Sequence, residues 1–275
     1  MQLRYPGFLD KAVTLSYDDG VIFDGKLIGI MTKYGLKGTF NLNSGHMGNA
    51  AWRRLSKEDA LKLYPGTGNE IAVHGVQHLS LCDYSDDLVI REVMRDRENL
   101  EELFGTVVRG MAYANGSCDD RVAKLAGSCG IVYSRTVVST EKFELPENWL
   151  LMPATCHHNN PRLTELCEEF LAIDASGGYL PTRKPKLFYL WGHSYEFNDN
   201  DNWYVIEDFA KRMGGKKNIW YATNMEIWEY VNAYNSLIRS ADGSLVSNPT
   251  AFEIFFIDGE ENTQYRLAPG ETVKL

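Results

Sequence analysis

The chain has 275 residues, of which 44% are hydrophobic and 24% charged, and its formal net charge is −9. This is an ordinary globular composition with enough apolar residues for a sizeable core. The acidic balance argues against a nucleic-acid partner or an anionic membrane surface, and no apolar run approaches the roughly 20 residues of a membrane span.

Short β-branched or aromatic runs alternate with helical patterns through the first 238 residues. The strand-like runs are residues 12–17, 36–43, 70–76, 107–113, 130–138, 149–155, 186–193 and 218–223. The helical patterns are residues 22–34, 56–64, 86–104, 119–128, 161–174, 202–213 and 224–238. Repeated strand–helix units predict a parallel sheet with helical crossovers, either a barrel or a doubly wound sheet. Eight strand-like runs in about 240 residues favour a barrel near TIM-barrel size.

The pattern changes after Ser240, where strand-like alternation and DG and PG turns replace the helical patterns. We therefore expect residues 1–240 to form the (β/α) barrel. Residues 241–275 are expected to form a small β-rich extension, which either closes one end of the barrel or is a minor accessory domain.

The five cysteines are odd in number and include no CxxC pair, which predicts free thiols in a reducing compartment. The N-terminal sequence MQLRYPGFLDK lacks the basic start and apolar core of a secretion signal. Both observations predict a cytoplasmic protein, although a secreted protein trimmed of its signal would begin in the same way.

Polar residues follow the ends of several predicted strands. In a parallel barrel these ends gather at one face, where catalytic groups lie. Five of the six histidines lie at or just after such an end, and the sixth, His46, follows the second strand. The strand-end residues are Asp18, Asp19, His74, His78, Tyr113, Asn115, His157, His158 and His193.

His74 and His78 are four residues apart, a spacing at which two imidazoles can reach one ion. No glutamate lies between them, so a third ligand and a general base must come from elsewhere. Asp18 and Asp19 can supply both, one carboxylate as a ligand and its neighbour as the proton acceptor. Seen alone, Asp-Asp-Gly is more often a solvated turn. Three protein ligands and an open position are typical of a catalytic site.

Hydrolysis of an amide also needs a general acid that protonates the departing amine. His193 suits this role by residue type and by its position at a strand end. The alternative is a buried, hydrogen-bonded histidine beside Trp191.

Together, the motifs SYDDG, HGVQH, YANG and LWGH resemble those of the carbohydrate esterase family 4 polysaccharide deacetylases, the NodB-homology domain. The resemblance spans most of the chain and implies a distorted (β/α) barrel of seven or eight parallel strands. It also implies a divalent metal ion, with zinc expected and cobalt or nickel as alternatives. The implied roles are catalytic base for Asp18, metal ligands for Asp19, His74 and His78, and catalytic acid for His193. The turn near Tyr113 and Asn115 is implied to carry a backbone oxyanion donor on the substrate side of the site.

The sequence departs from the family motifs in three places. Gly75 replaces the usual Ser or Thr of the second motif. The third motif, usually Arg-x-Pro-Tyr, aligns with residues 112–115 and lacks its arginine; Arg109 is near in sequence but is predicted to face the other side of its strand. The usual Asp-x-x-Asp-Trp segment has no clear match, and His157 or His158 either takes over part of its role in tuning the acid or belongs to a surface loop.

Aromatic residues surround the last motif, and a flat ring can stack on a sugar face. We expect Trp191 and Tyr195, which flank His193, to line a carbohydrate cleft. Trp203 and Tyr204 are expected to belong to the core.

The sequence predicts a metal-dependent hydrolase that removes N- or O-linked acetyl groups from a carbohydrate. The alternative is hydrolysis of a small, non-carbohydrate amide on the same barrel. A non-catalytic carbohydrate-binding protein is a third possibility, but its expected signature would be the loss of one of the five motif residues. The sugar, the oligomeric state and the role of His46 are not predicted.

Overall fold

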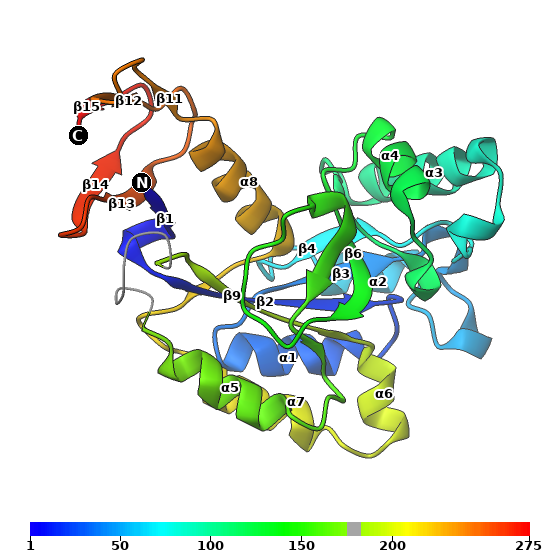
Figure 1. Ribbon diagram of the computed structural model, residues 1–275. Helices are drawn as coiled ribbons and strands as arrows, with labels where there is room; N and C mark the ends of the chain where they lie inside the picture. Colours follow the sequence, from blue (N-terminus) through cyan, green and yellow to red (C-terminus); the bar gives the residue numbers. More distant parts are fainter. Residues whose placement is uncertain (175–182) are drawn as a thin grey trace.

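The computed structural model describes residues 1–174 and 183–275. Within this part of the chain, nine parallel strands form the central sheet (Figure 1). Eight strands follow one another across it in the order β7 (Met152–Ala154), β6 (Tyr133–Ser139), β5 (Gly110–Ala112), β4 (Glu70–Val73), β3 (Gly38–Leu42), β2 (Lys11–Asp18), β9 (Lys186–Gly192) and β8 (Cys156–His157). The ninth, β10 (Trp220–Tyr221), pairs with the first half of β2.

The two edges of this sheet are consecutive in the chain. β7 pairs with β6, and β8 pairs with β9. Thr155 lies between them: its N–H donates to the Tyr189 carbonyl at 2.9 Å, and its carbonyl accepts the Glu141 N–H at 2.8 Å. One short segment therefore hydrogen-bonds to β9 and to the residues that follow β6, so the two sides of the sheet approach each other although no strand pairing closes the ring. This is the predicted distorted (β/α) barrel.

Helices follow most of the strands, as predicted. Among the described residues they are α1 (Asp24–Lys33), α2 (Lys57–Leu63), α3 (Asp86–Phe104), α4 (Asp120–Ser128), α5 (Leu163–Ala172), α6 (Ser194–Asp199), α7 (Tyr204–Met213) and α8 (Asn224–Asn235). Short 3-10 turns lie at Pro6–Phe8, Ser44–His46, Ala50–Trp52, Leu81–Asp83, Ala114–Gly116 and Trp149–Leu151. In Figure 1, α1, α5 and α7 lie together on one side of the sheet, and α3 and α4 lie together elsewhere around it. None of the described helices has the length and apolar character needed to cross a bilayer.

The longest helix shows why these patterns fold as they do. In α3, Val89, Val93 and Leu100 are fully buried on one face and join the main hydrophobic core under the sheet. Gly105 ends the helix with a φ of 64°, a conformation that glycine adopts without strain.

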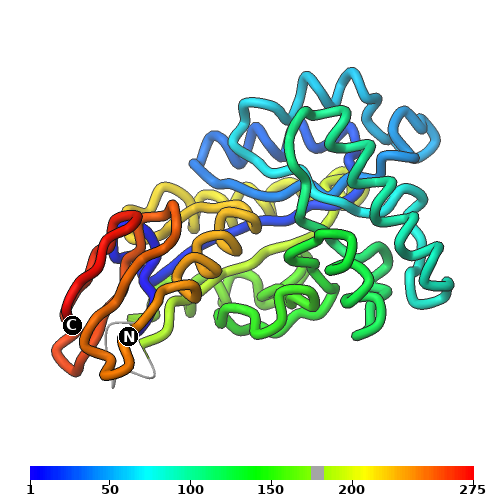
Figure 2. Tube along the Cα trace, turned by 90° about the horizontal axis from the view of Figure 1, so that it is seen from above, coloured from blue at the N-terminus to red at the C-terminus, as the bar shows by residue number. Residues whose placement is uncertain are grey.

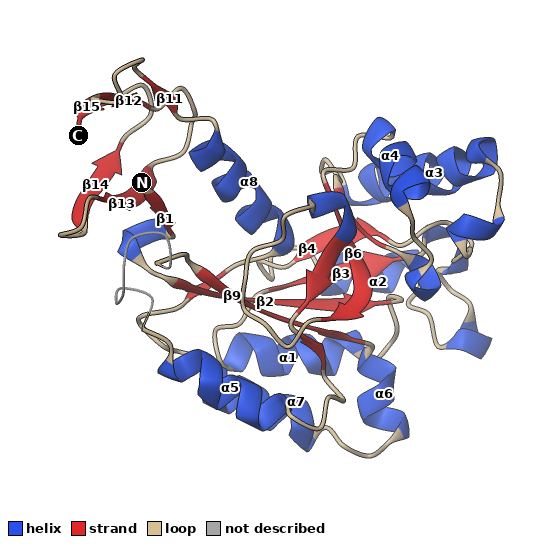
Figure 3. Cartoon of the chain, viewed as in Figure 1, coloured by secondary structure: helices blue, strands red, loops and turns tan. Residues whose placement is uncertain are grey.

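The C-terminal residues are strands, as predicted, and they pair with strands from earlier in the chain. One three-stranded sheet contains β1 (Gln2–Arg4), β13 (Ile254–Asp258) and β14 (Thr263–Leu267). Another contains β11 (Ile238–Arg239), β12 (Leu245–Ser247) and β15 (Thr272–Lys274). Figures 2 and 3 show both chain ends in this β-rich region. The boundary at residue 240 stays a prediction, since β11 and β12 pair across it.

Candidate active site

The end of β2 places two adjacent carboxylates where the parallel strands end. Asp18 is the last residue of β2 and is 2% exposed, and Asp19 follows with a φ of 87°. Gly20 continues the turn at a φ of 62°, and a Cβ there would lie 2.8 Å from Leu42 Cδ2. The turn therefore needs glycine, and the two carboxylates meet different partners.

Asp18 is held by two buried side chains, one from the adjacent strand β3 and one from β6, which does not pair with β2. Asn41 Nδ2 donates to its Oδ1 at 2.8 Å, and Arg135 Nη2 donates to its Oδ2 at 2.5 Å. Burial alone would raise the pKa of Asp18, but the Arg135 guanidinium, with His74 and His193, holds that pKa well below its usual range. Asp18 is therefore ionised and fixed in direction, as a proton acceptor must be.

Arg135 is a residue that sequence reasoning missed. It is fully buried on β6, and its guanidinium lies 4.2 Å above the Trp191 ring. Arg109, which the sequence places nearest the third motif, lies instead over Trp228. A charged residue inside the apolar run GIVYSRTVV was the available signal, because an arginine is fully buried only where it is paired.

Asp19 faces the two histidines of the second motif. Its Oδ1 lies 3.7 Å from His78 Nε2 and 3.9 Å from His74 Nε2. Arg54 Nη1 lies 2.8 Å from the same oxygen and also donates to the Asp19 carbonyl. Among the described residues, Asp19 Oδ1 nevertheless has no partner in hydrogen-bond geometry.

His74 is oriented by the strand beside it. Its Nδ1 lies 2.8 Å from the Ala112 carbonyl, an acceptor only, so Nδ1 carries the hydrogen and the Nε2 lone pair faces Asp19. Asn43 Nδ2 donates to the carbonyls of His74 and Gly75, and Asp96 Oδ2 accepts the His74 N–H at 3.0 Å. The first histidine of the pair is thus fixed by the main chain and by two buried side chains.

Gly75, the departure from the second motif, has a structural reason. Its φ is 82°, and a Cβ there would lie 2.7 Å from Glu92 Oε1. That oxygen accepts the Gln77 N–H at 2.6 Å, inside the histidine loop. Glu92 on α3 therefore stabilises this loop from the space that a side chain at residue 75 would need.

The residues present fit a divalent cation. The ligand atoms of Asp19, His74 and His78 all lie within 4.8 Å of one another. Burial and the neighbouring His74 lower the pKa of His78 to about 4, so its imidazole is neutral, the form that binds metals. Two imidazole nitrogens and one carboxylate oxygen form a donor set typical of zinc and related ions.

His193 reaches the same place from the end of β9. Its Nε2 lies 3.8 Å from Asp18 Oδ2, and its Nδ1 lies 3.5 Å from Glu196 Oε2 on α6. Ser194 donates to Asp24, which anchors α6 to α1. Burial lowers the pKa of His193, but the nearby carboxylates of Glu196 and Asp18 outweigh it and raise that pKa above its ordinary value. The protonated form that an acid needs is favoured.

Glu196, also missed from the sequence, is shared by three histidines. Its Oε2 lies 3.2 Å from His157 Nε2 and 3.0 Å from His158 Nε2, besides its contact with His193. His157, His193 and Glu196 also meet the spacing of a metal site. However, His157 Nδ1 accepts the Asn159 N–H, so its Nε2 carries the hydrogen and donates toward Glu196. This group is better described as a cluster of histidines around the Glu196 carboxylate than as a ligand set.

The prediction for the turn at Tyr113 is wrong for that amide. The Tyr113 N–H donates to the Arg135 carbonyl at 3.0 Å, so it is occupied in the sheet, and the phenol reaches the Leu150 carbonyl. Asn115 donates to Ser80 Oγ and lies 3.4 Å from the His78 carbonyl. It tethers the histidine loop instead of pointing into a cleft.

Two of the predictions for aromatic residues are also wrong. Trp191 is 8% exposed and packs on Arg135, so it lies beneath the site and offers no open face to a sugar. Tyr204 is 71% exposed and not part of the core, whereas Trp203 does pack against it. Tyr195 is partly exposed and lies 5.1 Å from the His193 ring, between centroids.

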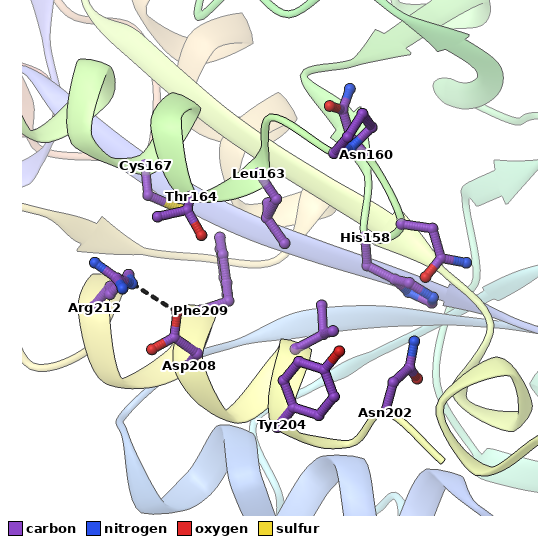
Figure 4. Close-up of a pocket in the computed structure, with 13 residues that line it drawn as sticks. His158, Asn160, Leu163, Thr164, Cys167, Asn202, Tyr204, Asp208, Phe209 and Arg212 are labelled. Atoms are coloured by element: carbon purple, nitrogen blue, oxygen red, sulfur yellow. Dashed lines mark hydrogen bonds and ion pairs between the residues drawn. The ribbon is translucent and has the colours of Figure 1, made fainter. Parts of the chain in front are cut away.

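Two cavities lie near the site. One of about 290 Å³ adjoins His78 and is lined by His46, Trp52, Arg54, Gln77 and His78. The other, of about 480 Å³, lies between α5 and α7, and Figure 4 shows Tyr204, Asp208 and Arg212 around it. His158 is at the edge of this second cavity and is also the residue that contacts Glu196.

Comparisons with known proteins bear on the fold and on the first half of the chain. Residues 7–134 match the family model described as polysaccharide deacetylase. No curated protein matches the sequence. Among solved structures, a provisionally assigned polysaccharide deacetylase from Mycobacterium smegmatis has a TM-score of 0.62 at 18% identity, covering 87% of this chain and 97% of that one. At this identity the likeness concerns the fold.

Two other similar structures are more distant. A family 4 carbohydrate esterase pseudoenzyme from Bacillus anthracis has a TM-score of 0.49 at 15% identity, covering 83% of this chain and 68% of that one. A Streptococcus pyogenes deacetylase in complex with acetate has a TM-score of 0.46 at 19% identity and covers 50% of this chain. The chain spans 61% of the length of that Streptococcus protein. Residues 7–134, a little under half of the chain, are therefore similar to the polysaccharide deacetylase family.

Proposed function

We propose that the chain is a metal-dependent deacetylase that hydrolyses acetyl groups on a carbohydrate. The match of residues 7–134 to the polysaccharide deacetylase family model supports the reaction class. The observation that carries the proposal is the convergence of five side chains from three strand ends: Asp18, Asp19, His74, His78 and His193. Fold alone does not imply activity, so the proposal depends on these residues.

Asp18 is assigned the role of general base. Its carboxylate is ionised, and Arg135 and Asn41 each occupy one of its oxygens. The remaining lone pairs can take a proton from the attacking water. Because both partners are buried, the carboxylate needs no reorganisation before it accepts the proton.

His193 is assigned the role of general acid. Its Nε2 faces Asp18, while Nδ1 faces Glu196, so the nitrogen nearest the reaction centre is the one that donates to the leaving nitrogen or oxygen. The Glu196 carboxylate stabilises the protonated ring, and His157 donates to that carboxylate in turn.

Asp19, His74 and His78 would hold the cation. When bound, a divalent ion supplies two effects: it polarises the acyl carbonyl, and it generates a nucleophile from water near neutral pH. The residues of the chain do the rest by fixing the base, the acid and the direction of each lone pair.

The test is acetate release from a panel of N- and O-acetylated mono- and oligosaccharides by the metal-reconstituted protein, with Asp18→Asn as the matched inactive variant. We expect acetate from at least one sugar and a loss of about 10²–10⁴-fold in kcat for the variant. Cleavage of a formylated or cyclic amide without any acetate release would favour the small-amide alternative and contradict the proposal.

A further inference from the structure

The 290 Å³ cavity beside His78 has a chemistry that the reaction itself does not require. Its lining residues are His46, Trp52, Arg54, Gln77 and His78, with no aspartate or glutamate among them. The Trp52 side chain is 53% exposed and meets the His46 ring edge-on at 4.5 Å between centroids. The cavity therefore combines one open aromatic ring with polar groups.

Two of those polar groups each keep one nitrogen without a hydrogen-bond partner among the described residues. The Arg54 side chain is 9% exposed and its Nε has no hydrogen-bond partner among the described residues. His46 is 8% exposed, and its Nδ1 is unpartnered within the same part of the chain. A buried polar group left unpaired is costly, and such a group in a native cavity points to a missing ligand.

The charge of the cavity sets the kind of ligand. Arg54 is always cationic, and its contact with Asp19 uses Nη1, which leaves Nε free. Asp19 is in turn shared with His74 and His78 in the set that fits a cation. The rest of the chain is acidic, at −9 overall, but distant charges are screened over about 8 Å at physiological salt. The lining itself thus contains one cation and no carboxylate, a composition that suits an anion.

We propose that this cavity is a subsite for an anionic group of the substrate, so that the enzyme prefers an acetylated sugar that also carries a carboxylate. Arg54 Nε–H and an imidazole N–H of His46 donate to the anion, and the exposed Trp52 ring packs against the sugar beside it. This rests on the deacetylase function proposed above for the reaction, though the binding of the anion does not require turnover.

The first experiment compares substrates that differ by one carboxylate. N-acetylmuramic acid and N-acetylglucosamine form one pair; acetylated methyl glucuronoside and acetylated methyl glucoside form another, which separates a lactyl carboxylate from a ring carboxylate. We expect the acidic member of at least one pair to have a kcat/KM at least tenfold higher, mainly through KM. Equal values for both pairs would overturn the proposal.

The variants separate recognition from folding. Arg54→Met should reduce the preference for the acidic sugar by about 10–100-fold, the range for a lost charged hydrogen bond. His46→Gln should reduce it less. Arg53→Met is the matched control, because Arg53 pairs outside the cavity with Asp199 at 2.6 Å and should leave the preference unchanged. If Arg54→Met weakens acidic and neutral sugars equally, Arg54 serves only to hold Asp19 and the proposal falls.

A binding measurement keeps this test independent of catalysis. Glucuronate and glucose are added to the wild-type protein, and the shift in the midpoint of thermal unfolding is recorded. We expect glucuronate to raise the midpoint for the wild type and for Arg53→Met, but not for Arg54→Met, while glucose leaves all three unchanged. If no sugar releases acetate but glucuronate still stabilises through Arg54, the deacetylase proposal fails and the anion subsite stands. The absence of any glucuronate effect would contradict the subsite.

Discussion

The residues of the candidate site form two groups: those within the region that matches the family model, residues 7–134, and those that follow it in the sequence. Both groups lie at one site, but they come from different strands. Asp18, Asp19, His74 and His78 come from residues 7–134, in two short motifs at the ends of β2 and β4. Arg135 comes immediately after the match, and His193 and Glu196 follow β9. In the proposed function the first group would supply the cation ligands and the base, while the second would control charge and protons around them. A family match that stops at residue 134 therefore describes half of the centre.

The largest expected effect is on kcat, and it tests whether residues of both groups take part in the reaction. Asp18→Asn and His193→Asn should each lower kcat by about 10²–10⁴-fold, because each removes a proton-transfer group. Steady-state acetate release on the best substrate measures both. Asp59→Asn, at an exposed helix start on α2, is the control and should keep full activity. A His193 variant with wild-type kcat would show that residues beyond the match are not part of the reaction.

Arg135 is the strongest structural link between the two parts. Arg135→Met removes one partner of a buried ion pair, and we expect a loss of about 3–5 kcal/mol in the free energy of unfolding, measured by urea denaturation. Arg109→Met, the arginine nearer in sequence to the third motif, should cost about 1 kcal/mol or less, since its side chain is partly exposed and stacks on Trp228.

The double variant Asp18→Asn/Arg135→Met sharpens that result. It leaves neither charge buried alone, so it should be more stable than Arg135→Met by itself. Simple additivity of the two single effects would mean that Asp18 and Arg135 are not energetically coupled, contrary to their 2.5 Å contact.

A substitution at Gly75 tests the departure from the second family motif. Gly75→Ser restores the usual residue type, but it must adopt a φ of 82° and displace Glu92. We expect a loss of about 1–3 kcal/mol by urea denaturation together with weaker metal retention, because the histidine loop moves. Gly48→Ser has a similar φ of 80° with no atom within 4 Å, so it measures the strain alone. Equal losses at the two positions would remove Glu92 from the account.

The smallest expected effect is on the pH dependence of stability. It concerns the Glu70 carboxylate, which lies away from the site and connects the matched region with α8. Glu70 on β4 accepts from Tyr133 Oη at 2.5 Å and from the Met225 N–H at 2.9 Å, on α8. Burial raises the pKa of Glu70 to about 7, above the roughly 4.3 of an unfolded chain. Between these values the folded state binds more protons, so its stability should fall as the pH rises, by at most about 1.4 kcal/mol per pH unit.

Glu70→Gln lacks this titration, and its stability should fall less steeply between pH 5 and 7 than that of the wild type. Urea denaturation across that range measures the two slopes. Parallel slopes for both proteins would show that Glu70 titrates in the folded state as it does in the unfolded chain.

The sequence predicted the features that have local signals, namely the repeated strand–helix units and the motifs of closely spaced residues. Eight strand-like runs, seven helices and the motifs around Asp18, His74 and His193 all have local signals, and their order was enough for the barrel. β8 has two residues and α6 has six, which is too short for a periodic pattern. Arg135 and Glu196 were missed because their importance comes from partners 117 and three residues away, and only the fold shows which atoms those partners present. The Tyr113 N–H is not available as the predicted oxyanion donor because it is used by β6, a pairing that spacing cannot reveal, and a donor elsewhere in that turn stays a prediction.

The central claim is that Asp19, His74 and His78 hold a divalent ion without which the centre does not deacetylate. The most direct measurement is acetate release by chelator-treated protein as zinc, cobalt or nickel is added back in stoichiometric steps, followed in parallel for His78→Gln. The account predicts that the treated wild type is inactive, that activity returns as ion is bound, and that His78→Gln regains little of it. Acetate release that survives chelation, or full recovery by His78→Gln, would contradict it.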